Sequence, residues 1–307
     1  EKSENYDVQV VRLIHGDTNP EGPGYKEEEI GASCNGNYEG RNQKIHGGSY
    51  IVIPQDNRFN TESFTLQAYV FPTTPDKGRQ GLLTKWNENN NSGYGVFIDD
   101  NACLSVMIGD GDGQVFNLSS EKKLMRKVWY LVAASYNSET GKVTLYQEPC
   151  VTPTNGGLGM SLLHPAEETT ALVDGTNNVK PGINDAPFLM AASTVKERSG
   201  RNISGGHYKE AINPVELPEH GFVYNGKIDR PRLSNKALTK AEIESLASSY
   251  TSCSSDLRAK VVGAWDFHAN ITKNIASTFI VDTSPSHLNG FIINLPCRGM
   301  TGYNWTA

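Results

Sequence analysis

The chain has 307 residues, 37% of them hydrophobic, with a mean hydropathy of -0.46 and a formal net charge of -6 at pH 7. This length suits one large β-domain or two smaller ones and is sufficient for an independent hydrophobic core. There is no run of eighteen apolar residues, so no membrane span is expected. The negative charge and the scattered basic residues give no electrostatic basis for binding nucleic acid.

The first stretch of interest is VVRLIHGDTNPEGPGYKEEEI, residues 10–30, which begins as an apolar strand and then turns polar. His15 and Asp17 are two positions apart, so a continuing strand would place both on one face, as a general base and its orienting partner require. No nucleophile is marked by the sequence. We therefore favour a structural junction, in which Gly22-Pro23-Gly24 sets a bend and the acidic run stays in solvent.

The N-terminus and the cysteines indicate the cellular compartment. The chain begins EKSENYDVQV, without an initiator methionine and without the apolar stretch of a secretion signal, so we expect it to start inside a longer gene product. Its five cysteines are odd in number and include no Cys-x-x-Cys pair, which argues against a zinc site and a disulfide framework. Reduced thiols in a cytoplasmic protein are expected.

Residues 48–148 consist of successive short strands separated by turn residues. The strand segments are SYIVIP, SFTLQAYVFPT, GLLTKWN, GYGVFIDD, CLSVMIGD, GQVFNLS, VWYLVAASYN and KVTLYQEP. Apolar and polar residues alternate from 64 to 70, whereas residues 128–134 are apolar on both faces, as in a central strand. Many short strands at regular spacing predict a β-sandwich or barrel.

The remainder contains long loops, one helix and the last strands. Residues 150–220 are rich in Pro, Gly, Asn and Thr and predict long loops that carry one or two strands, of which only 186–194 can be placed. The spacing of Thr239 and Glu242 is that of a capping box, which begins one short helix. Its apolar stripe would be Leu238, Ile243 and Leu246. Further strands are expected in VVGAWDF and NGFIINLP.

The series of motifs resembles the laminin-G-like, concanavalin-like jelly roll, an all-β sandwich of two antiparallel sheets. The most specific phrase is YNGKIDRPRLSNKALTKAEI, residues 224–243. The Trp265-x-Phe267 strand, which normally opens such a domain, here stands near the end. The resemblance therefore implies a permuted strand order, with Trp265 and Phe267 buried in the common core. The implied domains are an N-terminal strand and linker at 1–40 and a jelly roll at 41–307.

A narrower resemblance is to the large (beta) subunit of the N,N-dimethylformamidase family. The matching segments occur in the same order: VVRLIHGDTNPEGPGYKEE, GRQGLLTKWN, IGDGDG, HYKEAIN, YNGKID, AWDF and LPCRGMTGYNW. They span nearly the whole chain but only the N-terminal part of that subunit. The resemblance implies a parent amidohydrolase that cleaves small N-substituted formamides with iron-activated water. The family's iron ligands, tyrosines and a glutamate, fall beyond this chain, so no residue here is assigned to iron.

Residue types alone suggest two weak sites. Trp86 and Tyr94 are candidates for an aromatic ligand-binding platform, and Trp86 is expected to be exposed because an Asn-rich turn follows it; core packing is the alternative. Asp110 and Asp112 resemble the start of a calcium loop, but Val115 stands where such a loop needs glycine, so a hairpin turn is favoured. No GxSxG elbow or closely spaced histidine pair marks a catalytic or metal residue.

The sequence thus predicts a non-catalytic N-terminal β-sandwich region of an amidohydrolase large subunit, with a structural, subunit-docking role. Expected partners are the catalytic half of the same subunit, a small subunit or further copies, and neither nucleic acid nor membrane. No cofactor is expected in this chain, whereas the resemblance implies iron in the parent enzyme. The alternative is a lectin-like module that binds carbohydrate or another ligand, which saturable glycan binding dependent on Trp86 would favour.

Overall fold

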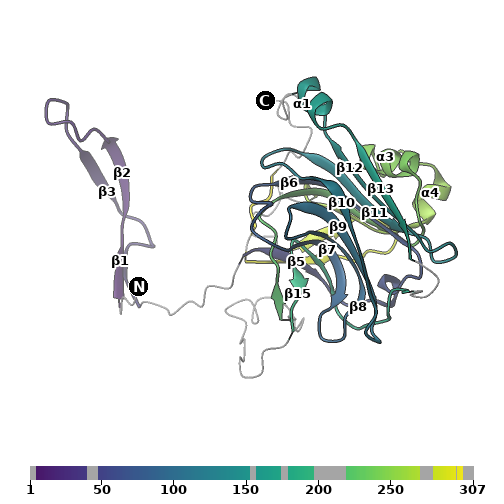
Figure 1. The fold of residues 1–307 in the computed structure, drawn as a ribbon. Coiled ribbons are helices and arrows are strands. Elements are labelled where there is room, and N and C mark those ends of the chain that lie inside the picture. Colours follow the sequence, from purple (N-terminus) through teal and green to yellow (C-terminus); the bar gives the residue numbers. More distant parts are fainter. Residues whose placement is uncertain are drawn as a thin grey trace. The chain divides into compact units, whose positions relative to one another are not determined.

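The computed structural model describes residues 5–39, 48–152, 157–173, 179–196, 219–269, 279–294 and 296–299. The chain divides into two compact units, Glu1–Ile45 and His46–Ala307 (Figure 1). The sequence placed a boundary at residue 40, within the stretch that the structure leaves undescribed. The larger unit holds the sandwich, and the smaller unit holds the junction stretch.

The N-terminal unit consists of two antiparallel ribbons. Strand β1 (Asn5–Val8) pairs with β4 (Gly36–Glu39), and β2 (Val10–His15) pairs with β3 (Lys26–Ile30). Every residue of β2 and β3 is exposed. Because a two-stranded ribbon encloses no core, this unit gains little stability from its own contacts.

The geometry of His15 and Asp17 is that of a hairpin connection. His15 is exposed and lies opposite Lys26, while Asp17 accepts a hydrogen bond from the backbone N–H of Asn19 at 2.8 Å. We expect His15→Ala and Asp17→Ala each to change the free energy of unfolding by less than about 1 kcal/mol, as for other exposed positions. Urea denaturation checks this, and a loss above about 2 kcal/mol in either variant would show that the residue has a structural role we have missed.

The larger unit is built on one continuous antiparallel sheet that folds over on itself. Its first half contains, in spatial order, β10 (Val115–Lys123), β9 (Cys103–Asp110), β8 (Ser92–Ile98), β7 (Gln80–Asn87), β14 (Phe188–Met190), β5 (Tyr50–Ile53), β20 (Gly290–Ile293) and β19 (Phe279–Asp282). Its second half contains β18 (Val261–Asp266), β17 (Gly226–Ser234), β6 (Phe64–Pro72), β11 (Tyr130–Tyr136), β12 (Lys142–Pro149) and β13 (Glu167–Leu172). The halves pack face to face as a sandwich (Figure 1), which confirms the predicted all-β jelly roll.

The core between the two halves explains why apolar and polar residues alternate from 64 to 70. Leu66 of β6 and Val132 of β11 are buried there against Val106 of β9. The ring of Phe64 stacks on that of Tyr94, with centroids 4.3 Å apart. Burial of such side chains is the main source of stability in the sandwich.

Helices cover the outer face of the second half. Helix α3 (Lys240–Ser248) and α4 (Ser255–Ala259) contribute to a second buried cluster with Trp129, Leu131 and Ala133. This cover is why that strand region is apolar on both faces. The predicted capping box is confirmed, because the side chains of Thr239 and Glu242 each accept a hydrogen bond from the other's backbone N–H.

Several short elements complete the unit. They are the 3-10 helix η1 (Asn57–Phe59), α1 (Leu158–Leu163), and the pair β15 (Ser193–Thr194) and β16 (His220–Gly221). Two of them, α1 and β15, fall in the predicted loop region 150–220, as do β13 and β14. Among the described residues, no helix is long and apolar enough to cross a membrane.

The late Trp-x-Phe strand belongs to the same sandwich. Strand β18 lies between β17 and β19, and the following β20 pairs with β5, which stands at the start of the unit. Trp265 is fully buried in the core that contains Phe64, as predicted. Phe267 is only partly buried, contrary to expectation, because it lies just beyond the end of β18, at the border of a cleft.

Candidate functional site

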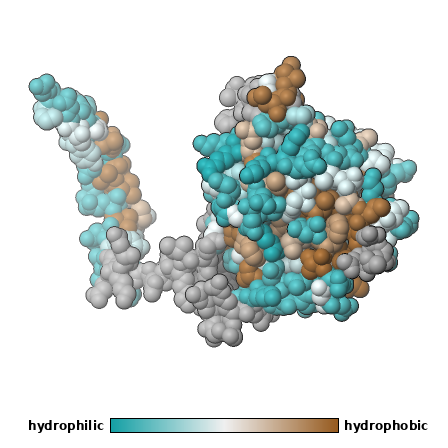
Figure 2. Space-filling view, viewed as in Figure 1, coloured by the Kyte–Doolittle hydropathy of each residue, from teal (hydrophilic) through white to brown (hydrophobic). Residues whose placement is uncertain are grey.

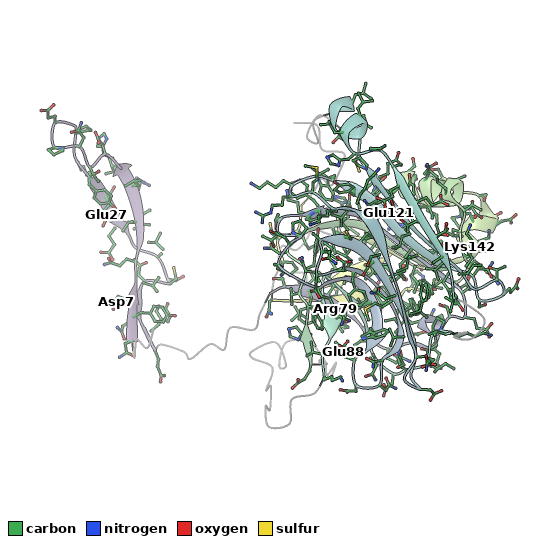
Figure 3. All side chains as sticks on the ribbon, viewed as in Figure 1. Asp7, Glu27, Arg79, Glu88, Glu121 and Lys142 are labelled. Carbon is green, nitrogen blue, oxygen red and sulfur yellow. The ribbon has the colours of Figure 1, made fainter. Side chains whose placement is uncertain are left out.

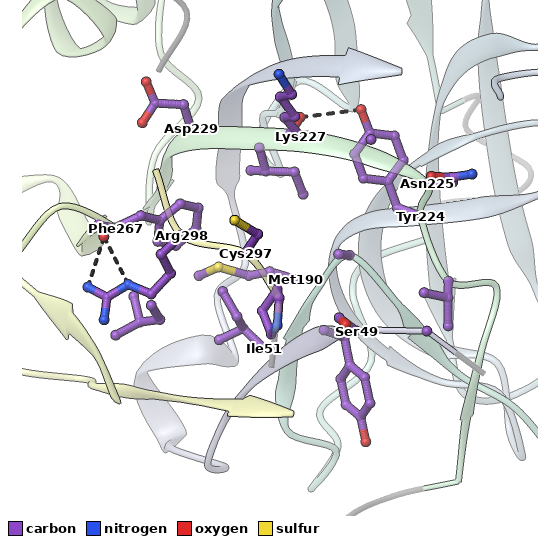
Figure 4. Close-up of a pocket in the computed structure, with 18 of the residues that line it drawn as sticks. Ser49, Ile51, Met190, Tyr224, Asn225, Lys227, Asp229, Phe267, Cys297 and Arg298 are labelled. Carbon is purple, nitrogen blue, oxygen red and sulfur yellow. Dashed lines mark hydrogen bonds between the residues drawn. The ribbon is translucent and has the colours of Figure 1, made fainter. Parts of the chain in front are cut away.

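A cleft of about 1200 Å³ lies beside the first residues of β5 and β17 (Figure 4). Its apolar lining includes Ile51, Met190 and Ile280, which are buried members of the sandwich core. The loops that follow β18 and β20 supply further lining residues, among them Phe267 and Arg298. A large cleft with an apolar lining and a few polar groups is the usual form of a small-ligand site.

Three cationic side chains line this cleft. The ammonium of Lys77 donates to the carbonyl of Val223. The guanidinium of Arg298 donates to the carbonyls of Phe267 and Ala269, and both of these bonds are 2.8 Å long. Burial lowers the pKa of both Lys77 and Arg298. Lys227 Nζ lies 4.9 Å from the centroid of the Phe71 ring. Within the described part of the chain, none of the three forms an ion pair.

The cleft also has one buried carboxylate. Asp229 on β17 is only 4% exposed, and its Oδ2 has no hydrogen-bond partner among the described residues. A buried polar atom without a partner is unfavourable and requires an explanation.

Unusual backbone conformations occur beside the same cleft. Ala191 and Phe222 line it with φ of 65° and 48°, and Arg230, which follows Asp229, has φ of 47°. Positive φ is unfavourable for residues that carry a side chain, and such strain is concentrated at functional sites. The ring of Phe222 is held by the guanidinium of Arg79, 4.3 Å from its centroid. Nothing in the local sequence signals this arrangement.

The expectation that Trp86 is exposed is wrong. Both Trp86 and Tyr94 are 1% exposed, so neither ring presents a face to solvent. Trp86 Nε1 donates to Glu88 at 2.6 Å, and Glu88 pairs with Arg79 at 3.2 Å (Figure 3). The Tyr94 hydroxyl donates to the carbonyl of Phe59. These partners satisfy the polar atoms of both side chains inside the sandwich and explain their inward orientation.

Asp110 and Asp112 lie at the hairpin between β9 and β10. The Asp110 carboxylate accepts hydrogen bonds from the backbone N–H groups of Asp112 at 2.8 Å and Gln114 at 3.0 Å. This is the turn that the sequence favoured over a calcium loop. Among the residues that the structure describes, no group of three His, Cys, Asp or Glu side chains is arranged to hold a metal ion.

The N-terminal unit presents a second candidate surface, made of exposed apolar side chains. Figure 2 shows hydrophobic residues along this unit. They are Tyr6, Val10, Val11, Leu13, Ile14, Tyr25, Ile30 and Tyr38, each at least 36% exposed. Large apolar side chains gathered on one small unit are typical of an interaction surface.

Comparison with curated proteins gives two relatives whose alignments cover nearly the whole of this chain. The chain is 32% identical over 310 residues to the N,N-dimethylformamidase beta subunit of Alcaligenes sp, and 32% identical over 305 residues to that of Paracoccus aminophilus. In each case 98% of this chain is covered. The chain spans only 37% of the length of either relative.

The sandwich also matches known families and folds. Residues 46–179 match the concanavalin A-like lectin/glucanases superfamily. A putative carbohydrate binding protein from Bacteroides ovatus aligns with a TM-score of 0.45 and 17% identity, over 83% of this chain and 60% of that one. The CBM40 of the Ruminococcus gnavus IT-sialidase, bound to α2,3 sialyllactose, aligns with a TM-score of 0.40 and 14% identity, over 62% and 84%. The chain is thus similar, over nearly its whole length, to part of the N,N-dimethylformamidase beta subunit, and it is built on a concanavalin-like jelly roll.

Proposed function

We propose that this chain is the non-catalytic β-sandwich region of a dimethylformamidase-like amidohydrolase large subunit and that it docks against the remaining part of that subunit. The observation that carries the proposal is the uncovered apolar surface of the N-terminal unit. The similarity to much longer subunits includes this unit, because 98% of the chain is aligned. A small subunit and further copies of the enzyme are additional partners; nucleic acid and membrane are not.

The parent enzyme, under this proposal, hydrolyses the C–N bond of a small N-substituted formamide with water activated by iron. Under this proposal the iron is held by the remaining part of the subunit. Burial raises the pKa of Tyr50, Tyr94 and Tyr130 above the ordinary value, which makes it costly for these three phenols to bind a metal as phenolates.

The isolated chain is expected to release no measurable dimethylamine from N,N-dimethylformamide and to purify without stoichiometric iron. The reason is that the proposal places the iron ligands in the remaining part of the subunit; among the described residues, no group of three His, Cys, Asp or Glu side chains could hold a metal ion. Elemental analysis and an amine-release assay check the two parts. About one iron per chain, or turnover that a chelator abolishes, would overturn the non-catalytic assignment.

Docking itself is tested with the remaining part of the parent subunit expressed as a separate chain. We expect residues 1–307 to co-purify with it and Leu13→Asp to weaken the association at least tenfold, because Leu13 is 58% exposed on the apolar ribbon. Leu172→Asp is the matched control, since Leu172 is 64% exposed on strand β13 of the sandwich. Equal losses in both variants, or none in either, would contradict docking through the ribbon.

A cytoplasmic location is part of the proposal and is supported by the cysteines. None of the five forms a disulfide, and Cys103, Cys150 and Cys253 are buried. Burial raises the pKa of the Cys150 thiol to about 12, which makes it an unreactive packing residue. Free thiols without disulfides are usual in a reducing compartment.

A second candidate function, binding of a carbohydrate or another small ligand, is favoured by the cleft of about 1200 Å³, whose lining combines apolar residues with Lys77, Lys227, Asp229 and Arg298. A glycan array followed by titration calorimetry tests this function, with Asp229→Asn as the variant and Asp112→Asn as the control. Saturable binding that only Asp229→Asn removes would support it, and binding unaffected by Asp229→Asn would exclude this cleft.

A further inference from the structure

The β2–β3 ribbon has two chemically different faces. Residues directly opposite one another share a face, and faces alternate along each strand. Val10 lies opposite Ile30 and Arg12 opposite Glu28, which together form what we call the neutral face. Val11 lies opposite Glu29 and Leu13 opposite Glu27, which form the acidic face.

The two faces differ in how their charges are compensated. On the neutral face, Arg12 Nη1 lies 3.9 Å from a carboxylate oxygen of Glu28. On the acidic face, Glu27 accepts a hydrogen bond from the Tyr25 hydroxyl at 2.5 Å, and Glu29 lies 3.4 Å from the side-chain amides of Gln9 and Asn35. Neither Glu27 nor Glu29 forms an ion pair with any described residue. The acidic face therefore combines a row of apolar side chains with a row of uncompensated carboxylates.

The surrounding unit reinforces this negative charge. Residues 5–39 contain seven acidic and two basic residues, a formal net charge of -5, in a chain whose total is -6. Figure 3 labels two of these acidic residues, Asp7 on β1 and Glu27 on β3. Most of the net charge is thus concentrated in about a ninth of the sequence.

We propose that the acidic face of the ribbon docks on a surface of the remaining part of the subunit that presents apolar residues flanked by lysine or arginine side chains. This inference rests on the proposed docking function and specifies its chemistry. Covering Val11 and Leu13 would also remove water from Glu27 and Glu29, and burying carboxylates is costly unless cations pair with them. A second copy of the same face is disfavoured, because it would bring four carboxylates together.

Hydrogen exchange on the full polypeptide that carries this chain and the remaining part of the subunit tests the proposal. The backbone amides of residues 10–15 are compared with those in chain 1–307 alone, at 50 mM and 500 mM NaCl. We expect at least tenfold greater protection in the full polypeptide, decreasing with salt because ion pairs at the edge of an interface are screened. The variants are Glu27→Gln/Glu29→Gln on the acidic face and Glu28→Gln, the neighbouring residue on the neutral face, as the matched control.

The double variant should lose most of the added protection and its salt dependence, whereas Glu28→Gln should stay within about twofold of the wild type. Loss in Glu28→Gln with retention in the double variant would show that the neutral face docks. Retained protection in all variants would show that the carboxylates play no part; in both cases docking itself would stand.

No added protection in the full polypeptide would overturn the proposed docking function as well. Protection in chain 1–307 that rises with its concentration would assign the ribbon to self-association.

Discussion

Replacement of Trp265 by alanine is expected to lower the free energy of unfolding by about 3–5 kcal/mol, the range for large aromatic side chains removed from a core. Trp265 is fully buried, and its ring stacks on Phe188 of the opposite half of the sheet, with centroids 5.4 Å apart. Its Nε1 donates to the carbonyl of Leu288 at 2.7 Å. The substitution thus leaves a cavity between the two halves and an unpaired carbonyl in the connection before β20.

Urea denaturation followed by circular dichroism measures this loss. Phe279→Ala is the matched control, because Phe279 lies on the adjacent strand β19 and is 50% exposed; it should cost less than about 1 kcal/mol. Since β18 to β20 share one core with β6, the Trp265→Ala variant should unfold in a single transition at lower urea. A separate early transition confined to residues after 260 would contradict the single-sandwich fold.

Lys85→Met is expected to cost about 3 kcal/mol, although methionine matches the length of the lysine side chain. Lys85 is 0% exposed, and its Nζ donates to the Gln55 side chain, to two oxygens of Asn184 and to the carbonyl of Ala186. Methionine leaves these acceptors unsatisfied in the interior, and each buried group left without a partner costs about 1–3 kcal/mol. Lys142→Met, at an exposed strand position, should change stability by less than about 0.5 kcal/mol.

The same lysine gives stability a defined pH dependence. Burial lowers the pKa of Lys85 to about 7, and the nearby Asp185 carboxylate partly offsets this. Between pH 7 and the ordinary value of 10.5, the unfolded chain therefore binds a proton that the folded chain does not. The contribution of Lys85 to the free energy of unfolding should rise with pH through that window. The difference in free energy of unfolding between the wild type and Lys85→Met should therefore increase between pH 7 and pH 9.5. A difference that stays constant from pH 7 to pH 9.5 would show that the folded protein keeps Lys85 charged.

The fold could be predicted where its signals are local. The capping box of α3 depends on two residues three positions apart, and the strands of residues 48–148 depend on alternation over a few positions. Strand β13 could not be placed because its sequence EETTAL lacks the usual apolar alternation; among the described residues it lies at the edge of the sheet and pairs with β12.

The candidate sites could not be predicted in the same way. Trp86 follows Lys85 and precedes an Asn-rich turn, which indicates exposure, yet both side chains are buried. Lys85 donates to Asn184, which is 99 residues away in the sequence, and Trp86 donates to Glu88, which pairs with Arg79. The cleft depends on residues from β5, β14, β17 and the loops after β18 and β20, which only the folded sheet brings together. Asp229 gave no local sign of being buried without a partner.

The proposed function is tested most directly by the mass of the native polypeptide that carries this sequence in cells. An antibody raised against residues 46–307 can isolate it for intact mass spectrometry. Because the chain spans 37% of the length of its curated relatives, we predict a polypeptide more than twice the 33.6 kDa of this chain. A native polypeptide of 33.6 kDa would contradict the assignment as one region of an amidohydrolase subunit.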